Sequence, residues 1–472
     1  MRRLLLNLLL LLALLALLRG GVFTAAPPDL PNDTSRFPAW LQAERQPASA
    51  LMNAALSDRF AWQRLAVLTD RVGHRLSGSD RLNQAIAWAV DEMKQDGLEN
   101  VHTEAVMVPH WVRGDESAEI VQPSPQPIAM LGLGGSVGTP PGGLQAEAIV
   151  VHDFGELAAH AAAVRGRIVV FNEPFEGYSQ TVHYRVDGAS RAAHDGAVAA
   201  LVRSVGLPGL RTPHTGYMEY ASDAPRIPTA AISGEDADRL QRMQSRGEHI
   251  VIRLKMDAKM LPDAASANVI GELRGRERPN EVVVVSGHLD SWDVGDGAMD
   301  DGGGCIATWE ALRLMKRLGL RPRRTIRVVL WTNEENGTRG GLAYRDQHLN
   351  ELKHTVMMLE SDSGVSNPDG VGFTGSGQAR HVIEAIATLL HPIGADHVGP
   401  EGGGADVDPS VEAAGIPAMS LDVDDSVYFR YHHTVADTVD KVDPIELSKC
   451  IAVVAVMAYV VADMPGELTQ TN

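Results

Sequence analysis

The run Glu281-Val-Val-Val-Val-Ser-Gly-His288-Leu-Asp290 contains the strongest indication of the fold. Four consecutive valines are typical of a strand that is buried on both faces, because a half-exposed strand alternates apolar and polar residues. Polar side chains follow at the point where the apolar run stops. The stretch therefore predicts a central strand whose carboxyl end carries ligand-binding residues.

The same pattern repeats toward the C-terminus, with helices between the strands. Residues 325–331 read Thr-Ile-Arg-Val-Val-Leu-Trp, residues 356–360 read Val-Met-Met-Leu-Glu, and residues 303–318 have a helical pattern. Strands that alternate with helices indicate βαβ units and a largely parallel sheet. We therefore expect an α/β sandwich.

Toward the N-terminus, two helical patterns over residues 61–72 and 79–97 precede a segment of different texture. In that segment, residues 112–260, glycine and proline cluster between short valine and isoleucine runs, which indicates a β-rich insert. The α/β domain would begin in residues 27–111, be interrupted by the insert, and be completed by residues 261–472. The proline-rich start, residues 27–47, is expected to be extended.

Composition and the first residues narrow the class of protein. A formal charge of −18 over 472 residues disfavours binding to nucleic acid. Two cysteines, Cys305 and Cys450, exclude a disulfide-rich scaffold, and both are expected to be buried thiols. Residues 1–26 have the pattern of a signal peptide, since basic residues precede an apolar run that is too short to span a bilayer. We expect an exported protein, secreted or periplasmic, with no membrane anchor after signal removal.

Histidine and carboxylate side chains gather where the strands end or where helices begin. Such side chains converge beyond the carboxyl ends of the strands in an open α/β sheet. Histidine with carboxylates and no cysteine is the ligand set of a catalytic zinc site, and a shared carboxylate can hold two ions together. A single motif of this kind is more often a solvated surface feature. Five such motifs in this order along the chain favour a metal site instead. The candidates are His288, Asp290, Asp300, Asp301, Glu334, Glu335, Asp362, His432 and His433.

Spacing leaves three adjacent pairs undecided, namely Asp300/Asp301, Glu334/Glu335 and His432/His433. Neighbouring side chains diverge, so one glutamate would bind metal while the other faces the water. The aspartate that is not a ligand would cap the following helix. Asp290 is well placed to accept the second ring N–H of His288 and so to orient it.

The chain resembles the M28 family of co-catalytic zinc peptidases. The resemblance rests on the runs Ser286-Gly-His-Leu-Asp-Ser-Trp-Asp-Val-Gly, Met299-Asp-Asp-Gly-Gly-Gly, Trp331-Thr-Asn-Glu-Glu and Arg75-Leu-Ser-Gly-Ser, and it extends over nearly everything after the signal peptide. The family implies a three-layer αβα sandwich of the zinc exopeptidase type with an eight-stranded, mixed, mostly parallel sheet. It also implies that the insert is similar to a protease-associated domain.

Carried over residue by residue, the resemblance implies two zinc ions per chain. Its assignments are His288 and Asp362 on one ion, Glu335 and His433 on the other, Asp300 as the bridge, Glu334 as the catalytic carboxylate and Asp290 as the residue that orients His288. A zinc-activated water would attack the peptide carbonyl, with Glu334 as general base. His432 would then be structural.

The family also implies an exported metallo-exopeptidase that hydrolyses short peptides, chiefly dipeptides with free termini, and that forms a homodimer. The alternatives are an M28-type aminopeptidase, a non-catalytic M28-like binding ectodomain, and a glutaminyl cyclase with a single zinc ion. Candidates for the substrate pocket are Asp406, which matches the family's pocket-lining stretch, and two aromatic residues before the last histidine loop, Tyr428 and Tyr431.

Overall fold

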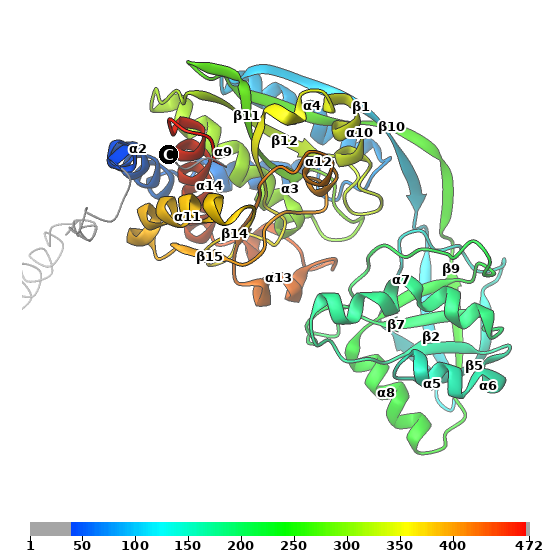
Figure 1. The fold of residues 1–472 in the computed structure, drawn as a ribbon. Helices are drawn as coiled ribbons and strands as arrows, with labels where there is room; N and C mark the ends of the chain where they lie inside the picture. The colour runs from blue at the N-terminus through cyan, green and yellow to red at the C-terminus, as the bar shows by residue number, and fades with distance from the viewer. Residues whose placement is uncertain (1–38, 469–472) are drawn as a thin grey trace, which may run out of the picture. The chain divides into compact units, whose positions relative to one another are not determined.

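The computed structural model describes residues 39–468, so the expected signal peptide lies outside the described residues. A mixed sheet of eight strands forms the frame of the functional site (Figure 1). In spatial order its strands are β1 (Glu99–Val112), β10 (Lys259–Leu273), β12 (Arg324–Trp331), β11 (Arg278–His288), β13 (Thr355–Glu360), β16 (Ala418–Asp422), β14 (Gly370–Thr374) and β15 (His397–Gly399).

The central strands of this sheet are parallel, and antiparallel pairs flank them. Strand β11 pairs in parallel with β12 and β13, and β13 pairs in parallel with β16. By contrast, β10 is antiparallel to both β1 and β12, and β14 is antiparallel to β16. The eight-stranded, mixed sheet that the family resemblance implies is confirmed.

Helices cover both faces of the sheet, which gives the three layers. Because successive strand residues point to opposite faces, Val283 and Val285 belong to one buried cluster while Val284 belongs to another. The helices of the first cluster are α2 (Ala39–Ser57), α3 (Phe60–Arg71), α4 (Asp80–Gln95), α9 (Gly303–Arg317), α11 (Gly377–Ala387) and α14 (Pro444–Asp463). Those of the second are α10 (Arg339–His348) and α12 (Asp408–Ala414).

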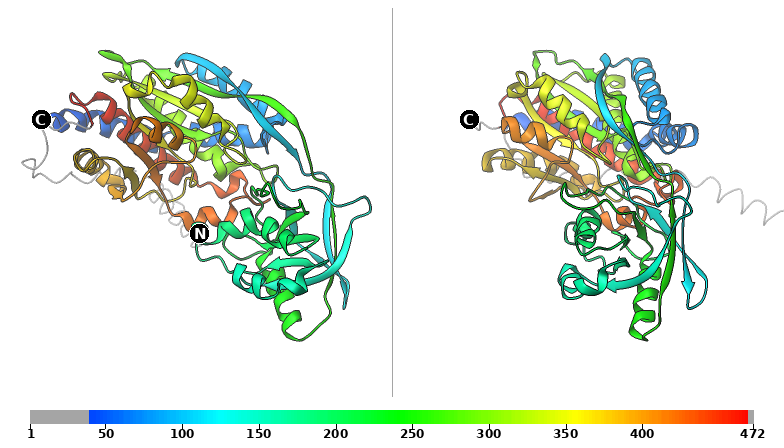
Figure 2. Two further views of the ribbon diagram at one scale, coloured as in Figure 1. Left: turned by 45° about the vertical axis from the view of Figure 1, so that its right-hand side comes forward. Right: turned by 90° about the vertical axis from the view of Figure 1, so that its right-hand side faces the viewer.

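The helical patterns of the sequence correspond closely to α3, α4 and α9. Helix α4 begins after Ser79, whose hydroxyl accepts the N–H of Leu82, and buries a stripe that includes Ile86 and Met93. The expectation of an extended chain up to residue 47 is wrong from residue 39 onward, because α2 continues through Pro47. Proline removes one helical hydrogen bond, but α2 buries an apolar stripe beside α14 (Figure 1 and Figure 2).

Helix α14 is long and apolar enough to cross a membrane, with a mean hydropathy of 2.0, but 83% of its most apolar window is buried inside the protein. It is therefore the core helix of the first cluster. Cys450 in this helix and Cys305 in α9 are both buried and unbridged, as expected from the sequence.

A second sheet of eight strands is formed by residues between β1 and β10. Its strands, in spatial order, are β3 (Gln126–Ile128), β2 (Glu116–Gln122), β9 (Val251–Met256), β5 (Leu144–Val151), β6 (Ile168–Phe171), β7 (Ala199–Arg203), β8 (Thr229–Ile232) and β4 (Met130–Gly132). This segment also has helices between its strands. It contains α5 (Phe154–Ala159), α6 (Ala161–Val164), α7 (Tyr178–His194) and α8 (Gly234–Ser245).

Several contacts join this second region to the loops beyond the carboxyl ends of the first sheet. Arg113, which follows β1, donates to the carboxylate of Asp293 at 2.9 Å. Gly134 of the insert packs against Trp292, since a Cβ on this glycine would lie 2.0 Å from the indole ring. The loop that carries Trp292 and Asp293 follows β11 directly, so these contacts connect the insert to the predicted site.

Candidate metal centre

The strand ends bring the predicted ligands together. His288 is the last residue of β11 and pairs in register with Trp331, the last residue of β12. The loop after β12 carries Glu334 and Glu335, and Asp362 lies two residues beyond the end of β13. Because β12 and β13 both run parallel to β11, all of these side chains lie at one edge of the sheet.

Asp300 lies between the two predicted histidine ligands. It comes from the turn η2 (Ala298–Gly302) that precedes α9, and it is 4% exposed. Its Oδ1 lies 3.2 Å from Nε2 of His288, while its Oδ2 lies 3.3 Å from Nε2 of His433. The two oxygens of one carboxylate therefore face two different imidazoles.

Each histidine also faces a second carboxylate. Nε2 of His288 lies 3.2 Å from Oδ1 of Asp362, and Nε2 of His433 lies 3.0 Å from Oε2 of Glu335. Two ligand atoms about 2.1 Å from a tetrahedral zinc ion are about 3.4 Å apart, close to these separations. The donor set and its spacing thus fit a divalent cation next to each imidazole.

Backbone carbonyls fix the tautomers of both histidines. Nδ1 of His288 lies 3.0 Å from the carbonyl oxygen of Asp290, and Nδ1 of His433 lies 3.2 Å from the carbonyl oxygen of Thr215 in the insert. A carbonyl oxygen can only accept, so Nδ1 carries the hydrogen in each ring. The free lone pair on Nε2 consequently points toward the carboxylates, as a metal ligand requires.

Asp290 lies beside His288, but its carboxylate has a different role from the predicted one. Its Oδ1 is 3.8 Å from Nδ1 of His288, too far for a hydrogen bond. Instead, Oδ1 accepts the N–H of Glu334 at 3.1 Å, and Oδ2 accepts the hydroxyl of Ser77 at 3.1 Å. The backbone of Asp290 orients His288, while its side chain holds the loop that carries Glu334.

The electrostatics of the site indicate a need for positive charge. Burial raises the pKa of Glu334 and Glu335 well above the usual value, and the neighbouring carboxylates, Asp362 for Glu334 and Asp300 for Glu335, raise it further. Although burial lowers the pKa of His288, Asp362 and Asp300 raise it well above its usual value. Oδ2 of Asp300 is buried without a hydrogen-bond partner among the described residues. Cations at this position would compensate the buried negative charge.

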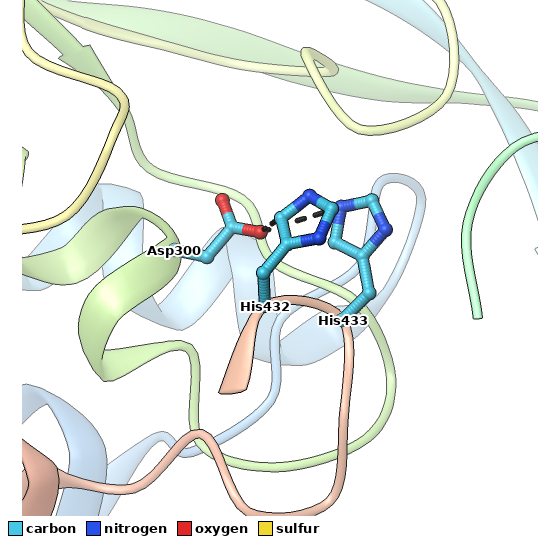
Figure 3. A group of neighbouring side chains, drawn as sticks. All are labelled: Asp300, His432 and His433. Carbon is cyan, nitrogen blue, oxygen red and sulfur yellow. Dashed lines mark ion pairs between the residues drawn. The ribbon is translucent and has the colours of Figure 1, made fainter. Parts of the chain in front are cut away.

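His432 lies beside the candidate ligands without the geometry of His433. Figure 3 shows the two rings stacked next to Asp300, with centroids 3.5 Å apart. Nε2 of His432 is 3.8 Å from Oδ2 of Asp300, compared with 3.3 Å for His433. Nδ1 of His432 has no partner among residues 39–468, so nothing there fixes its tautomer. The geometry favours His433 as the ligand.

Asp301, the neighbour of Asp300, points the other way. Its Oδ1 accepts the N–H of Gly304 at 3.0 Å, in the first turn of α9, and its Oδ2 accepts the N–H of His288 at 3.0 Å. These contacts correspond to the capping role that the sequence left open for the aspartate that does not bind metal.

A cavity of about 630 Å³ opens onto these residues. Of the three predicted pocket residues, Tyr428 lines it, whereas Asp406 and Tyr431 do not. Asp406 is fully buried, and its N–H donates to the carboxylate of Glu360 at the end of β13. Tyr431 faces Lys441, whose ammonium lies 5.7 Å from the ring centroid.

Sequence reasoning missed the contribution of the insert to this cavity. Tyr178 and Arg185 of α7, together with Tyr217, line the same cavity as Glu334 and Asp362. No motif in the insert marks these residues, since their position depends on how the insert packs against the loops of the first sheet. Only the structure places them at the site.

Asp437 is a second residue that was missed, although it belongs to the segment His433-x-x-x-Asp437-Thr. Its Oδ1 accepts the N–H groups of Ala298 and Met299 at 3.1 and 2.7 Å, and its Oδ2 accepts that of Asp300 at 3.2 Å. The carboxylate of Asp437 therefore holds the turn that presents Asp300. Charge-assisted bonds of this kind are among the stronger ones in proteins.

We expect Asp437→Asn to weaken metal binding about 10- to 100-fold, because residues that support ligands typically have effects of this size. An asparagine can accept on one side alone, so it loses at least one of the three backbone bonds. Metal titration of the purified variant measures the effect. Asp440→Asn is the control, since Asp440 lies three residues away and its carboxylate, among residues 39–468, accepts side-chain hydrogen bonds only from Thr438 and Lys441. Equal metal affinity in both variants would contradict the positioning role.

Comparisons with known proteins agree with this geometry. Residues 268–458 match the model of peptidase family M28. The chain is 48% identical over 427 residues to Carboxypeptidase Q of Mus musculus, which covers 90% of this chain and 91% of that protein. It is 49% identical to Carboxypeptidase Q of Homo sapiens, with 90% of each chain covered.

Solved structures show the same fold. The crystal structure of a peptidase M28 precursor from Shewanella amazonensis superposes with a TM-score of 0.87 at 36% identity, and it covers 90% of this chain and 98% of that one. A zinc aminopeptidase from Bacillus subtilis superposes with a TM-score of 0.65 at 20% identity, covering 87% and 96% of the two chains. At that identity, the second likeness concerns the fold alone.

Proposed function

The chain belongs to peptidase family M28 and is a metallopeptidase, and from this premise we propose that it is an exported di-zinc exopeptidase that cleaves short peptides, chiefly dipeptides with free termini. The observation that carries the proposal is the position of Asp300, whose two oxygens face His288 and His433 at 3.2 and 3.3 Å. A carboxylate in that position can be shared by two ions.

The residues present would hold the two ions in two groups. His288 and Asp362 would bind one ion, Glu335 and His433 would bind the other, and Asp300 would contribute one oxygen to each. When bound, zinc ions supply Lewis-acid polarisation of the scissile carbonyl and lower the pKa of the attacking water.

Glu334 supplies the proton transfer that hydrolysis needs. It is half-buried, it lines the cavity, and a carboxylate oxygen of Glu334 lies within 4.8 Å of ligand atoms of His288 and Asp362. Glu335 is otherwise engaged, since its Oε1 accepts the N–H of Trp292 at 3.0 Å and its Oε2 faces His433. A carboxylate of Glu334 would therefore take a proton from the attacking water and pass it to the nitrogen of the departing amine.

The proposal also extends to the surroundings of the enzyme. After signal removal the chain would carry no membrane anchor and no nucleic-acid partner, in keeping with the net charge of −18 of the full sequence and the basic-then-apolar pattern at its start. It would act as a homodimer, as the family resemblance implies.

Turnover of free, N-blocked and C-amidated forms of one dipeptide, with zinc counted on the same preparation, tests the proposal. We expect hydrolysis of the unblocked dipeptide alone and about two zinc ions per chain. Cleavage of the C-terminal amide as fast as the free acid would indicate an aminopeptidase instead. A metal content near one would favour the single-zinc cyclase.

A further inference from the structure

Arg185 of the insert presents an unpaired, buried positive charge to the cavity. It is 4% exposed, and it lies seven residues after Tyr178, so both side chains project from one face of α7. Its Nη2 donates to the hydroxyl oxygen of Tyr178 at 2.7 Å, and its Nε donates to the carbonyl oxygen of Tyr217 at 3.2 Å. Its Nη1 is buried without a hydrogen-bond partner among the described residues.

Within the described part of the chain, Arg185 combines the lack of a counter-ion with an unbonded nitrogen. Arg75 is also buried there without an ion pair, but its guanidinium donates to four backbone carbonyls. Arg113 is paired with Asp293 and Glu116, and Arg324 is paired with Glu281 and two backbone carbonyls. Arg185 forms no ion pair with any carboxylate in residues 39–468; both of its hydrogen bonds go to neutral oxygens. A buried charge without a partner is costly, so the arrangement indicates an anion supplied by a ligand.

The backbone around Arg185 is shaped to hold the guanidinium in place. Gly216 has a φ of +141°, and a Cβ at this position would lie 2.4 Å from Nη1 of Arg185. A side chain on residue 216 would therefore displace the guanidinium. The glycine allows the group to sit against the chain, with its orientation fixed by Tyr178 and by the carbonyl of Tyr217.

Arg185 and the candidate metal centre share one cavity. Tyr178, Arg185, Glu334 and Asp362 all line it. The ring of Tyr178 meets that of His432 edge to face at 5.6 Å, and Nε2 of His432 lies 3.8 Å from Asp300. Thr215, whose carbonyl oxygen lies 3.2 Å from Nδ1 of His433, directly precedes Gly216, so a short peptide with its scissile bond at the metal centre can reach Arg185 within this cavity.

We propose that Arg185 and Tyr178 bind the C-terminal carboxylate of the peptide substrate, which makes Arg185 a residue that determines exopeptidase specificity. This inference rests on the proposed function. The guanidinium offers Nη1 to the carboxylate, and the phenol, whose oxygen already accepts from Nη2, has its own hydrogen free to donate. By binding the C-terminal carboxylate, the pair would determine which peptide bond of the substrate lies at the metal centre.

The test is binding of a non-hydrolysable ligand, the reduced-bond analogue of alanyl-alanine, compared with its C-terminal amide. Calorimetry on the full-length, zinc-loaded chain is expected to show that the free acid binds about 10- to 100-fold more tightly than the amide, the range of a charge-assisted hydrogen bond. Arg185→Met should remove this preference, with both ligands bound as weakly as the amide. Equal binding of acid and amide by the parent chain, or an undiminished preference in R185M, would overturn the inference.

Further variants guard against a folding effect. Arg191→Met, on the exposed side of the same helix, should keep the full preference. Tyr178→Phe, which leaves Arg185 in place, should reduce it by roughly 10-fold, the lower end for a hydrogen bond to a charged group. If R185M does not fold, Arg185→Lys is the variant to measure, because lysine keeps the positive charge but lacks the planar guanidinium. If R185K bound the free acid over the amide as selectively as the parent chain does, the inference would be contradicted.

Hydrolysis of alanyl-alanine by the parent chain is measured in parallel. A chain that binds the free acid selectively but cleaves no dipeptide would refute the proposed function while supporting the role of Arg185. A chain that cleaves dipeptides without distinguishing acid from amide would leave the peptidase standing and refute the role of Arg185.

Discussion

Glu334→Gln is expected to lower kcat on a free dipeptide by about 10²- to 10⁴-fold, the contribution typical of a general base. Glutamine has nearly the same shape but cannot take a proton from water. The backbone of residue 334 stays anchored by Asp290, so the loop should keep its position. Metal content and melting temperature should therefore remain those of the parent chain.

The matched control is Glu335→Gln, a change of the same chemistry at the adjacent residue. The carboxylate of Glu335 faces His433 at 3.0 Å and would be a ligand, so this variant should lose metal as well as activity. Steady-state kinetics together with a zinc count separate the two effects. If E334Q retained near-full turnover, or lost zinc while E335Q kept it, the assignment of the two glutamates would be wrong.

The sequence predicted the centre of the fold because its signals there are local. Four valines in a row define β11, and the residues that follow β11, β12 and β13 must meet because parallel strands end at one edge. The sheet thus determines which residues assemble, largely independently of side-chain detail. The register between His288 and Trp331 is a direct consequence of that arrangement.

Features that depend on side-chain direction or on distant packing were harder to predict. The spacing of His288 and Asp290 suggested a contact with the carboxylate, but the chain turns so that the carbonyl is the acceptor. Thr215 and Arg185 reach the site from the insert. Thr215 contacts His433 although 218 positions separate the two residues in the chain. Nothing local marks either of them. Pro47 likewise suggested an extended segment, whereas tertiary packing against α14 keeps the helix intact.

Asp300→Asn is expected to have the second large effect, because it removes the carboxylate that two ions would share. Asparagine has a single oxygen, so it cannot offer one acceptor to the His288 side and another to the His433 side. We expect zinc to fall from about two ions per chain to less than one. Activity should fall by at least about 10³-fold, since several kcal/mol of transition-state stabilisation would be lost.

Asp362→Asn is the matched control for Asp300→Asn. Asp362 faces His288 at 3.2 Å and has no contact with His433, so its replacement should weaken one ion and leave the other bound. The two variants should therefore differ in the number of zinc ions bound per chain even if both lose activity. If D300N kept one zinc ion at parental affinity, as D362N is expected to do, Asp300 would serve a single ion. The two-ion arrangement would then have to be abandoned, because among residues 39–468 Asp300 alone has a carboxylate in close contact with both imidazoles.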